Sequence, residues 1–337
     1  MLSLLLAGLV ATVVIALLGE NPLHVASVML SGSMGSLRSL ANTLEEATPL
    51  ILTGLCVAVG MRSGLFNIGG EGQLVVGAFV AAWLGTKLPI ANPTVHVLIC
   101  VLAAGVAGAM WAMIAGVLRA RFGAHEVINT IMLNYVAFIS TNYLVNLPYF
   151  KKPGQIPQTF DVAATAYLPR LTFLYKYTRL NAGLFIALAA VVVVWVLLAR
   201  TRLGFEIRTV GLNPLASRYA GISVVRTMIL AMGIGGFLAG VAGAERVLGV
   251  HKHFISPFPF GYGFGGIAVA LLARNNPFGI LITAIFFGAL ASGGAQVDMV
   301  TNVPRELVTV IQAVIILFVA CEYLIRRSKP KEVCSSE

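Results

Sequence analysis

The stretch Arg62-Ser-Gly-Leu-Phe-Asn67-Ile-Gly-Gly-Glu71-Gly-Gln73 decides how the rest of this sequence is interpreted. This polar, glycine-rich segment lies between two strongly apolar runs, at about 47–61 and 74–86. An unpaired backbone amide or a carboxylate is costly in hydrocarbon, so such a segment persists at membrane depth only against protein or a water-filled path. Glycines allow neighbouring backbones to approach closely, and Asn67, Glu71 and Gln73 supply polar groups that a solute can meet. We therefore expect these three side chains to line or brace a translocation pathway.

The composition is that of a membrane protein. Hydrophobic residues make up 58% of the chain and charged residues only 11%, against about 25% charged residues in soluble domains, and the mean hydropathy is +0.90. The 35 glycines suit helix packing in lipid. The net charge of +10 lies mostly in loops between apolar runs, so membrane topology explains it better than a nucleic-acid partner does. These features predict one all-α, polytopic transmembrane domain over residues 1–337.

Apolar runs that can cross a bilayer occur about ten times. The run near 262–274 is short, which suits a complete short span or a re-entrant or broken helix. The predicted spans are at about 2–18, 46–62, 70–86, 95–118, 126–147, 181–199, 225–246, 262–274, 277–296 and 306–325.

Basic residues near the ends of these spans predict the orientation, because they concentrate on the cytoplasmic side. The predicted arrangement has both termini in the cytoplasm, a cytoplasmic loop at about 200–224, a cytoplasmic tail at about 326–337 and an extracytoplasmic loop at about 148–180. The last of these also carries basic residues, which weakens the rule there, although long loops translocate with less regard to charge.

The 200–224 loop contains the signals of a very short helix. Asn213 suits the N-cap, Pro214 the first helical position and Gly221 a C-terminal stop. The resulting helix of about six residues is near 9 Å long, too short to span a membrane. It is either a rigid coupling element for a cytoplasmic ATPase or an interfacial loop that anchors to phospholipid through its arginines.

Further polar and aromatic side chains are candidates for contact with the solute. Asn129, Asn134 and Asn142 lie in the run at 126–147, and Asn134 and Asn142 are eight residues apart, close to two helical turns. Buried amides suit the hydroxyl groups or base edges of a neutral solute, although they also serve as interhelical hydrogen-bond partners. Phe258 and Phe260 lie among glycines and prolines, where they form either a stacking face for a planar ligand or an interfacial turn.

Sequence signatures of enzymes and metal sites are missing. The chain contains no Gly-x-x-x-x-Gly-Lys-Ser/Thr motif, so we expect that it does not hydrolyse ATP. The four cysteines are not paired at metal-ligand spacing, and we expect neither a metal nor a cofactor.

The 62–73 segment, together with its context on both sides, resembles permease subunits of bacterial ABC importers for nucleosides, simple sugars and branched-chain amino acids. The resemblance covers almost the whole chain and is greatest for the nucleoside branch. It implies a permease in the bacterial cytoplasmic (inner) membrane that acts with a cytoplasmic ABC ATPase, a second permease subunit, identical or related, and an extracytoplasmic solute-binding protein. The pattern from Gly211 to Gly221 is similar to the family's coupling segment, which implies ATPase contacts by Gly211, Asn213, Pro214, Ala216, Arg218, Tyr219 and Gly221.

The sequence leaves alternatives open for the solute that is carried and for the energy source that drives transport. A nucleoside comes first by resemblance, with ribose, another simple sugar or a flavin-like molecule behind it. An ion-coupled secondary transporter is the alternative of a different class, for which Glu71 or Glu126 are the available carboxylates. Such a transporter would work on an ion gradient alone, whereas an ABC importer needs its ATPase.

Overall fold

The computed structural model describes residues 2–17, 19–172, 175–259, 261–301, 303, 310, 313 and 314. Within these residues the chain is helical, and the only β-pairing is in isolated bridges such as Lys151 with Thr159. The predicted all-α class is therefore confirmed. The cytoplasmic tail and nearly all of the predicted span at 306–325 lie outside the described residues.

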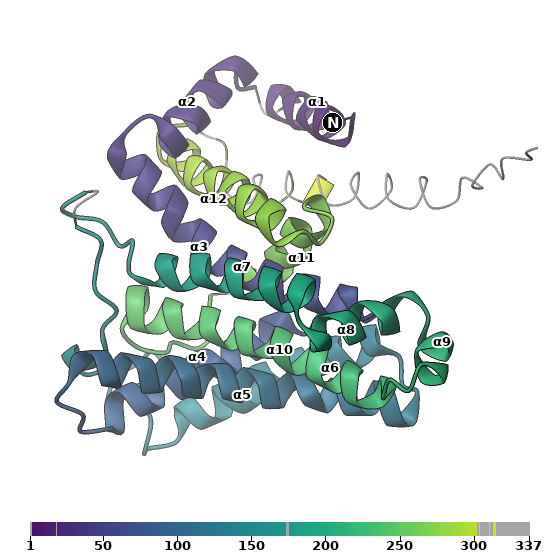
Figure 1. Ribbon diagram of the computed structural model, residues 1–337. Coiled ribbons are helices and arrows are strands. Elements are labelled where there is room, and N and C mark those ends of the chain that lie inside the picture. The colour runs from purple at the N-terminus through teal and green to yellow at the C-terminus, as the bar shows by residue number, and fades with distance from the viewer. Residues whose placement is uncertain are drawn as a thin grey trace, which may run out of the picture.

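Figure 1 shows the helices in chain order. A three-residue 3₁₀ turn, Ala164–Ala166, lies in the long loop after α6, and a π-helical segment, Arg246–His251, continues α10. The helices are α1 (Leu2–Leu17), α2 (Pro22–Met34), α3 (Leu37–Arg62), α4 (Gly70–Lys87), α5 (Pro93–Phe122), α6 (Glu126–Asn146), α7 (Gly183–Arg200), α8 (Arg202–Leu212), α9 (Pro214–Tyr219), α10 (Val224–Glu245), α11 (Tyr262–Leu272) and α12 (Pro277–Val300).

Five of the described helices are long and apolar enough to cross a membrane: α3, α5, α7, α12 and α10 with its π-helical extension. Helix α11 has 11 residues and is about 16 Å long, roughly half the hydrocarbon thickness of a bilayer. The run predicted to be short is thus a short helix. In its first turn Gly263 is buried, whereas Phe264 is exposed.

Two helices were not predicted, and α3 begins earlier than expected. Helix α3 starts at Leu37 after Ser36, whose hydroxyl accepts a hydrogen bond from the backbone N–H of Ser39. Its first third carries polar and charged side chains, so the hydropathy of the sequence did not predict that part of the helix. Helices α2 and α8 were missed for the same reason, because neither is a long apolar run.

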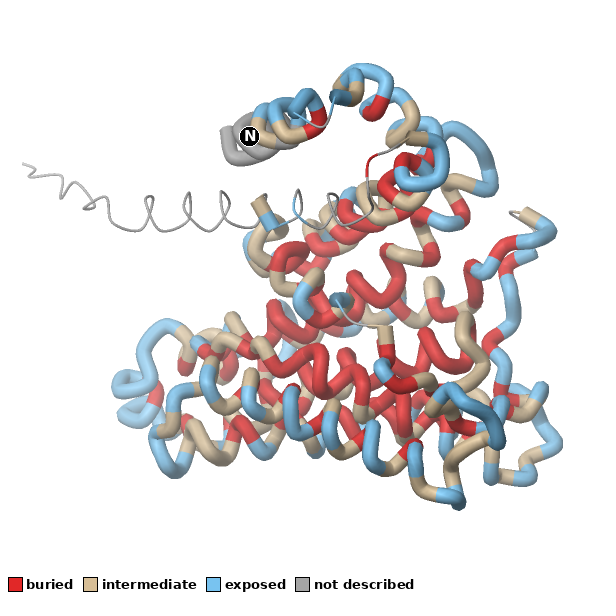
Figure 2. The backbone as a smooth tube through the Cα atoms, turned by 180° about the vertical axis from the view of Figure 1, so that it is seen from behind, coloured by how far each residue is buried: buried red, intermediate tan, exposed pale blue. Residues whose placement is uncertain are grey.

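Glycines bring the central helices into backbone contact. A Cβ atom added at Gly77 of α4 would lie 2.5 Å from the Cα of Gly240 in α10, and one added at Gly108 of α5 would lie 2.3 Å from the carbonyl oxygen of Gly236. Such close packing replaces the hydrophobic effect between helices in lipid. Figure 2 shows the buried segments gathered in the interior of the molecule.

The two ends of the bundle differ. Helices α8 and α9 project at one end, called here the α9 end, on the right in Figure 1, and the long loop between α6 and α7 lies at the other, called the loop end. Helix α3 runs from the loop end to the α9 end, where the Nη2 of Arg62 donates a 3.1 Å hydrogen bond to the carbonyl oxygen of Asn275.

Candidate functional site

The 62–73 segment forms a turn that is closed by a pair of buried amides. Residues 63–69 connect α3 to α4. The Nδ2 of Asn67 donates to the Oε1 of Gln73 at 3.1 Å, and the Nε2 of Gln73 donates to the Oδ1 of Asn67 at 3.0 Å. Each side chain is only 1% exposed. The reciprocal pair therefore satisfies both amides inside the protein.

Glu71 caps the N-terminus of α11. Its Oε1 accepts a hydrogen bond from the backbone N–H of Gly261 at 2.9 Å, and its Oε2 accepts from Gly263 at 2.7 Å and from Phe264 at 3.2 Å. The first N–H groups of a helix have no partner within the helix, and a carboxylate there also interacts favourably with the helix dipole. Glu71, which is fully buried, thus holds α11 against α4.

Asn134 braces the same segment from α6. Its Nδ2 donates to the carbonyl oxygen of Ile68 at 3.0 Å, and its Oδ1 accepts from the backbone N–H of Gly72 at 2.9 Å. The structure therefore brings Asn134 together with Asn67, Glu71 and Gln73, which the sequence had placed in two separate groups.

The other candidate contacts lie elsewhere. Asn129 is half-buried, and its Nδ2 has no hydrogen-bond partner within the described part of the chain. Asn142 is exposed, and its Oδ1 accepts a 2.8 Å hydrogen bond from the hydroxyl of Ser256. Asn134 and Asn142 thus differ in burial, although they are two turns apart. Phe258 is buried in a stack with Phe254, with 5.1 Å between the ring centroids, and Phe260 is outside the described residues.

Helix α9 has the local structure that its sequence predicted. The Oδ1 of Asn213 accepts hydrogen bonds from the backbone N–H groups of Leu215 at 3.0 Å and Ala216 at 3.1 Å, Pro214 is the first helical residue and Gly221 has a φ of +76°. Its surface is unusually apolar for an exposed helix, because Tyr219 is 95% and Leu215 66% exposed. Ala216 and Arg218 are exposed as well.

Gly211, in contrast, belongs to the attachment of this element to the bundle. A Cβ atom added at Gly211 in α8 would lie 2.1 Å from the carbonyl oxygen of Arg62 and 3.0 Å from the backbone nitrogen of Gly64. Helix α8 therefore rests directly on the turn that starts the 62–73 segment, and α9 extends from α8 (Figure 1).

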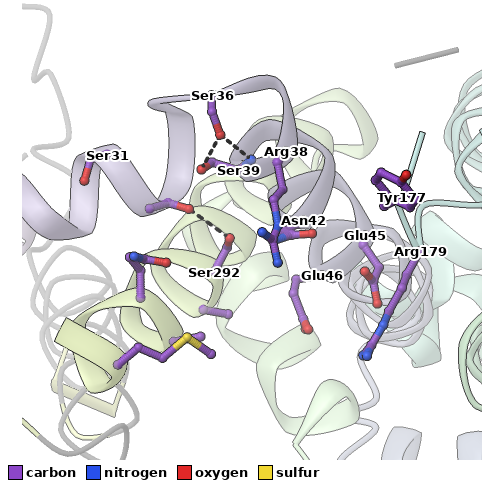
Figure 3. A pocket seen from close by; sticks show the side chains of 15 residues that line it. Ser31, Ser36, Arg38, Ser39, Asn42, Glu45, Glu46, Tyr177, Arg179 and Ser292 are labelled. Carbon is purple, nitrogen blue, oxygen red and sulfur yellow. Dashed lines mark hydrogen bonds between the residues drawn. The ribbon is translucent and has the colours of Figure 1, made fainter. Parts of the chain in front are cut away.

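A polar cavity at the loop end was not predicted from the sequence. It has a volume of about 590 Å³ and lies among α2, α3, α12 and the loop before α7 (Figure 3). The side chains on one side of it come from the first third of α3, namely Arg38, Ser39, Asn42, Glu45 and Glu46, and the rest of the lining is Ser31, Gly32, Ser36, Tyr177, Arg179, Ala291, Ser292, Ala295, Gln296 and Met299. Two adjacent glutamates ahead of a long apolar run were the available signal, since intramembrane carboxylates mark functional sites.

Beneath this cavity lies a buried network of charged and aromatic groups. The hydroxyl of Tyr262 donates a 2.9 Å hydrogen bond to the Oε2 of Glu46. The guanidinium of Arg246 lies 4.7 Å from the centre of the Tyr262 ring, and its Nη1 is 3.6 Å from the Oε1 of Glu45. The network links α3, the π-helical segment and α11, so the floor of the cavity is tied to the helix that Glu71 caps.

Five of the described helices are long and apolar enough to cross a membrane, which agrees with the family that the chain matches. Residues 39–320 match the family described as the branched-chain amino acid transport system / permease component. The chain belongs to this permease family. It is accordingly an integral membrane protein and the transport component of its system rather than a catalytic one.

Individual relatives of the permease match along nearly its whole length. A guanosine ABC transporter permease of Bacillus subtilis is 39% identical over 328 residues, which are 96% of this chain and 92% of the relative. A nucleoside ABC transporter permease of Lactococcus lactis is 37% identical over 98% of this chain and 92% of the relative. A glucose ABC transporter permease of Haloferax volcanii is 36% identical over 97% of this chain and 87% of the relative.

Proposed function

We propose that this permease is the membrane subunit of an ABC importer that carries a nucleoside into the cytoplasm. The names of the guanosine and nucleoside permeases, which match at 39% and 37% identity, support this solute. The glucose permease at 36% identity makes a simple sugar such as ribose or glucose the next candidate. A flavin-like solute follows, in line with a riboflavin import permease of Treponema pallidum at 24% identity.

The projecting helix α9 is the observation that carries this proposal. An exposed helix of six residues contributes little to the stability of the bundle, yet its N-cap, its first-position proline and the exposed Leu215 and Tyr219 make it a rigid, partly apolar knob. Such a knob suits a groove on a cytoplasmic ABC ATPase. We assign the ATPase contact to Asn213, Pro214, Ala216, Arg218, Tyr219 and Gly221, and the attachment of the knob to Gly211.

The topology that we propose follows from the ATPase contact, because the ATPase is cytoplasmic and α9 must then face the cytoplasm. The α9 end faces the cytoplasm and the loop end faces outward, in a bacterial cytoplasmic membrane, with both termini inside. About ten spans are proposed, to which α1, α4, α6, α11 and the run at 306–325 contribute beside the five long apolar helices. A second permease subunit and an extracytoplasmic binding protein complete the importer.

Coupling follows a continuous set of contacts. Movement of α9 displaces α8, whose Gly211 rests on the backbone at Arg62 and Gly64. That backbone leads into the segment where Asn67 and Gln73 are paired and where Glu71 holds α11. The first residue of α11, Tyr262, contacts Glu46 at the cavity. We propose that this chain of contacts transmits closure of the ATPase to the pathway, and that Asn67, Glu71, Gln73 and Asn134 brace the pathway.

The ion-coupled alternative requires a carboxylate that titrates during transport. Glu71 is fully buried and accepts hydrogen bonds from three backbone N–H groups. Glu126 is paired with Arg119 at 3.2 Å. Both carboxylates named for that alternative are therefore engaged in structural contacts, which favours the ATP-driven importer.

The test is reconstitution of the permease with its ATPase, its second permease subunit and its binding protein in liposomes. We expect uptake of radiolabelled guanosine that requires ATP and a hydrolysis-competent ATPase and that persists when ionophores collapse ion gradients. Uptake driven by an ion gradient without ATP would replace the proposal with the secondary transporter. ATP-driven uptake of glucose but not of guanosine would keep the importer and change its solute.

A further inference from the structure

Two adjacent carboxylates of α3, Glu45 and Glu46, line the polar cavity and differ in exposure and in partners. Glu45 is 7% exposed and lies 3.6 Å from the Nη1 of Arg246. Glu46, the next residue, is half-buried and lines the same cavity. Its Oε2 accepts from the hydroxyl of Tyr262, whereas no hydrogen bond from the described residues reaches its Oε1. A carboxylate is an acceptor at both oxygens, so Glu46 retains capacity for further O–H or N–H donors.

The charges around the cavity balance. Arg38 of α3 and Arg179 of the loop line the same cavity as Glu45 and Glu46, and Figure 3 shows Arg179 beside Glu45. The formal charge of these four lining side chains sums to zero. A cavity that selected an anion or a cation would carry an excess of the opposite sign. This one suits a neutral solute with many hydrogen-bonding groups.

The cavity has the size of a site for a small molecule. Its volume of about 590 Å³ falls within the range of roughly 300–1,000 Å³ that is typical of small-molecule sites. Asn42 lies one helical turn before Glu46, on the same face of α3. Tyr177 lies at the side of the cavity formed by the loop before α7, where it is 76% exposed (Figure 3).

We propose that this cavity is the outward-facing recognition site for the ribose of a nucleoside, with Glu46 accepting hydrogen bonds from the 2′- and 3′-hydroxyls. The proposal rests on the proposed function. A side-chain carboxylate is an established partner for ribose hydroxyls in nucleotide-binding folds, and a hydrogen bond to a charged acceptor is stronger than one between neutral groups. Asn42 supplies a second polar contact, and Tyr177 offers an aromatic face for the base. Tyr262 and Arg246 position Glu46 from below without touching the solute.

The test compares Glu46→Gln with the unmodified permease in the reconstituted importer, using guanosine and 2′,3′-dideoxyguanosine. The same binding protein is present in every experiment, so a difference between variants belongs to the permease. The substitution keeps a side-chain oxygen for the hydroxyl of Tyr262 and removes the charge. Glu20→Gln, which makes the same change outside the cavity, is the matched control.

We expect Glu46→Gln to lower guanosine uptake about ten- to hundredfold, the amount that corresponds to a hydrogen bond to a charged group. Uptake of 2′,3′-dideoxyguanosine should change little, so the ratio of guanosine uptake to dideoxyguanosine uptake should fall. In the control Glu20→Gln this uptake ratio should equal that of the unmodified permease. Asn42→Ala, at an exposed position that folding tolerates, should also reduce guanosine uptake.

Several outcomes would overturn the assignment. One such outcome is that Glu46→Gln leaves guanosine uptake and the ratio of guanosine uptake to dideoxyguanosine uptake unchanged while the unmodified permease transports guanosine. In that case the ribose site is wrong and the proposed function stands. If Glu46→Gln reduces both nucleosides equally, Glu46 supports the structure and not the ribose. If Glu46→Gln fails to assemble, unchanged guanosine uptake in Asn42→Ala overturns the site. Failure of the unmodified importer to transport any nucleoside would overturn the proposed solute itself.

Discussion

The carboxylate of Glu71 accepts a 2.7 Å hydrogen bond from the backbone N–H of Gly263, 192 positions later in the sequence. This contact joins the polar turn between α3 and α4 to a helix of only 11 residues, whose first N–H groups would otherwise lack partners inside the protein. The acidic residue that looked most like a transport site is therefore the N-terminal cap of this short helix. Its contribution to transport follows from that structural role.

Replacing Glu71 with glutamine separates a cap from a proton carrier. The Glu71→Gln side chain has one amide oxygen and one NH₂ group, so at least one of the three backbone N–H groups faces a donor. Leaving a buried donor without a partner costs about 1–3 kcal/mol. We expect a lower midpoint of thermal unfolding and a reduced rate of guanosine uptake that shows no new dependence on pH. Complete loss of uptake in this variant, with ATP-independent transport by the unmodified protein, would instead identify Glu71 as a coupling group.

The amide pair of Asn67 and Gln73 makes a second prediction. In Asn67→Asp a carboxylate oxygen replaces the Nδ2 that donates to the Oε1 of Gln73, so two acceptors face each other in a buried site. We expect the free energy of unfolding to fall by about 1–3 kcal/mol, measured by thermal or denaturant unfolding in detergent. Asn142→Asp, at an exposed position on α6, is the control and should change stability much less. Equal effects of the two substitutions would contradict a structural role for the pair.

Local rules predicted those parts of the structure that depend on neighbouring residues. The N-cap at Asn213 and the first-position proline at Pro214 determined α9, and the structure has both. The polar turn at 62–73 could be placed in the interior because hydrocarbon excludes its unpaired groups. The partners of Glu71, however, come from Gly261, Gly263 and Phe264, and no spacing in the sequence indicates a contact across such a distance.

The polar cavity could not be assembled from the sequence for the same reason. Glu46 in α3, Tyr177 in the loop and Gln296 in α12 meet only after the helices pack. Hydropathy also concealed the first third of α3, because Arg38, Glu45 and Glu46 lower its average. The packing of Gly211 also depends on a distant segment, because a Cβ atom added to it would lie 2.1 Å from the carbonyl oxygen of Arg62. Its contact with an ATPase stays a prediction.

The side assignment of the bundle is tested by single cysteines in a variant that lacks the native ones. A cysteine at Leu215, which is 66% exposed on α9, should react with a membrane-impermeant maleimide only from the cytoplasmic side. One at Ala164, exposed in the loop before α7, should react only from outside. A cysteine at the buried Ala137 should react from neither side. Labelling of position 215 from outside would invert the topology and remove α9 from the ATPase.

The attachment of the projecting helix to the bundle is tested at Gly211. In Gly211→Ala the new Cβ would lie 2.1 Å from the carbonyl oxygen of Arg62. Because that clash is with the backbone, α8 must shift, and the midpoint of thermal unfolding should fall. Transport should be uncoupled from ATP hydrolysis, although the ATPase still binds. Gly123→Ala, at a glycine with open space around its Cα but a φ of +69°, controls for strain alone and should preserve coupling. Full coupling in Gly211→Ala would show that α8 does not transmit the movement of α9.

Contact between the projecting helix and the ATPase is tested at Tyr219. This side chain is 95% exposed, so Tyr219→Asp should leave the fold and the thermal midpoint unchanged. The substitution places a charge on an apolar docking surface. We expect the ATPase to co-purify poorly and ATP-driven uptake to fall at least about tenfold, the effect of losing roughly 1.4 kcal/mol of contact energy. Normal uptake and normal ATPase stimulation in Tyr219→Asp would show that α9 is an interfacial anchor and not the coupling element.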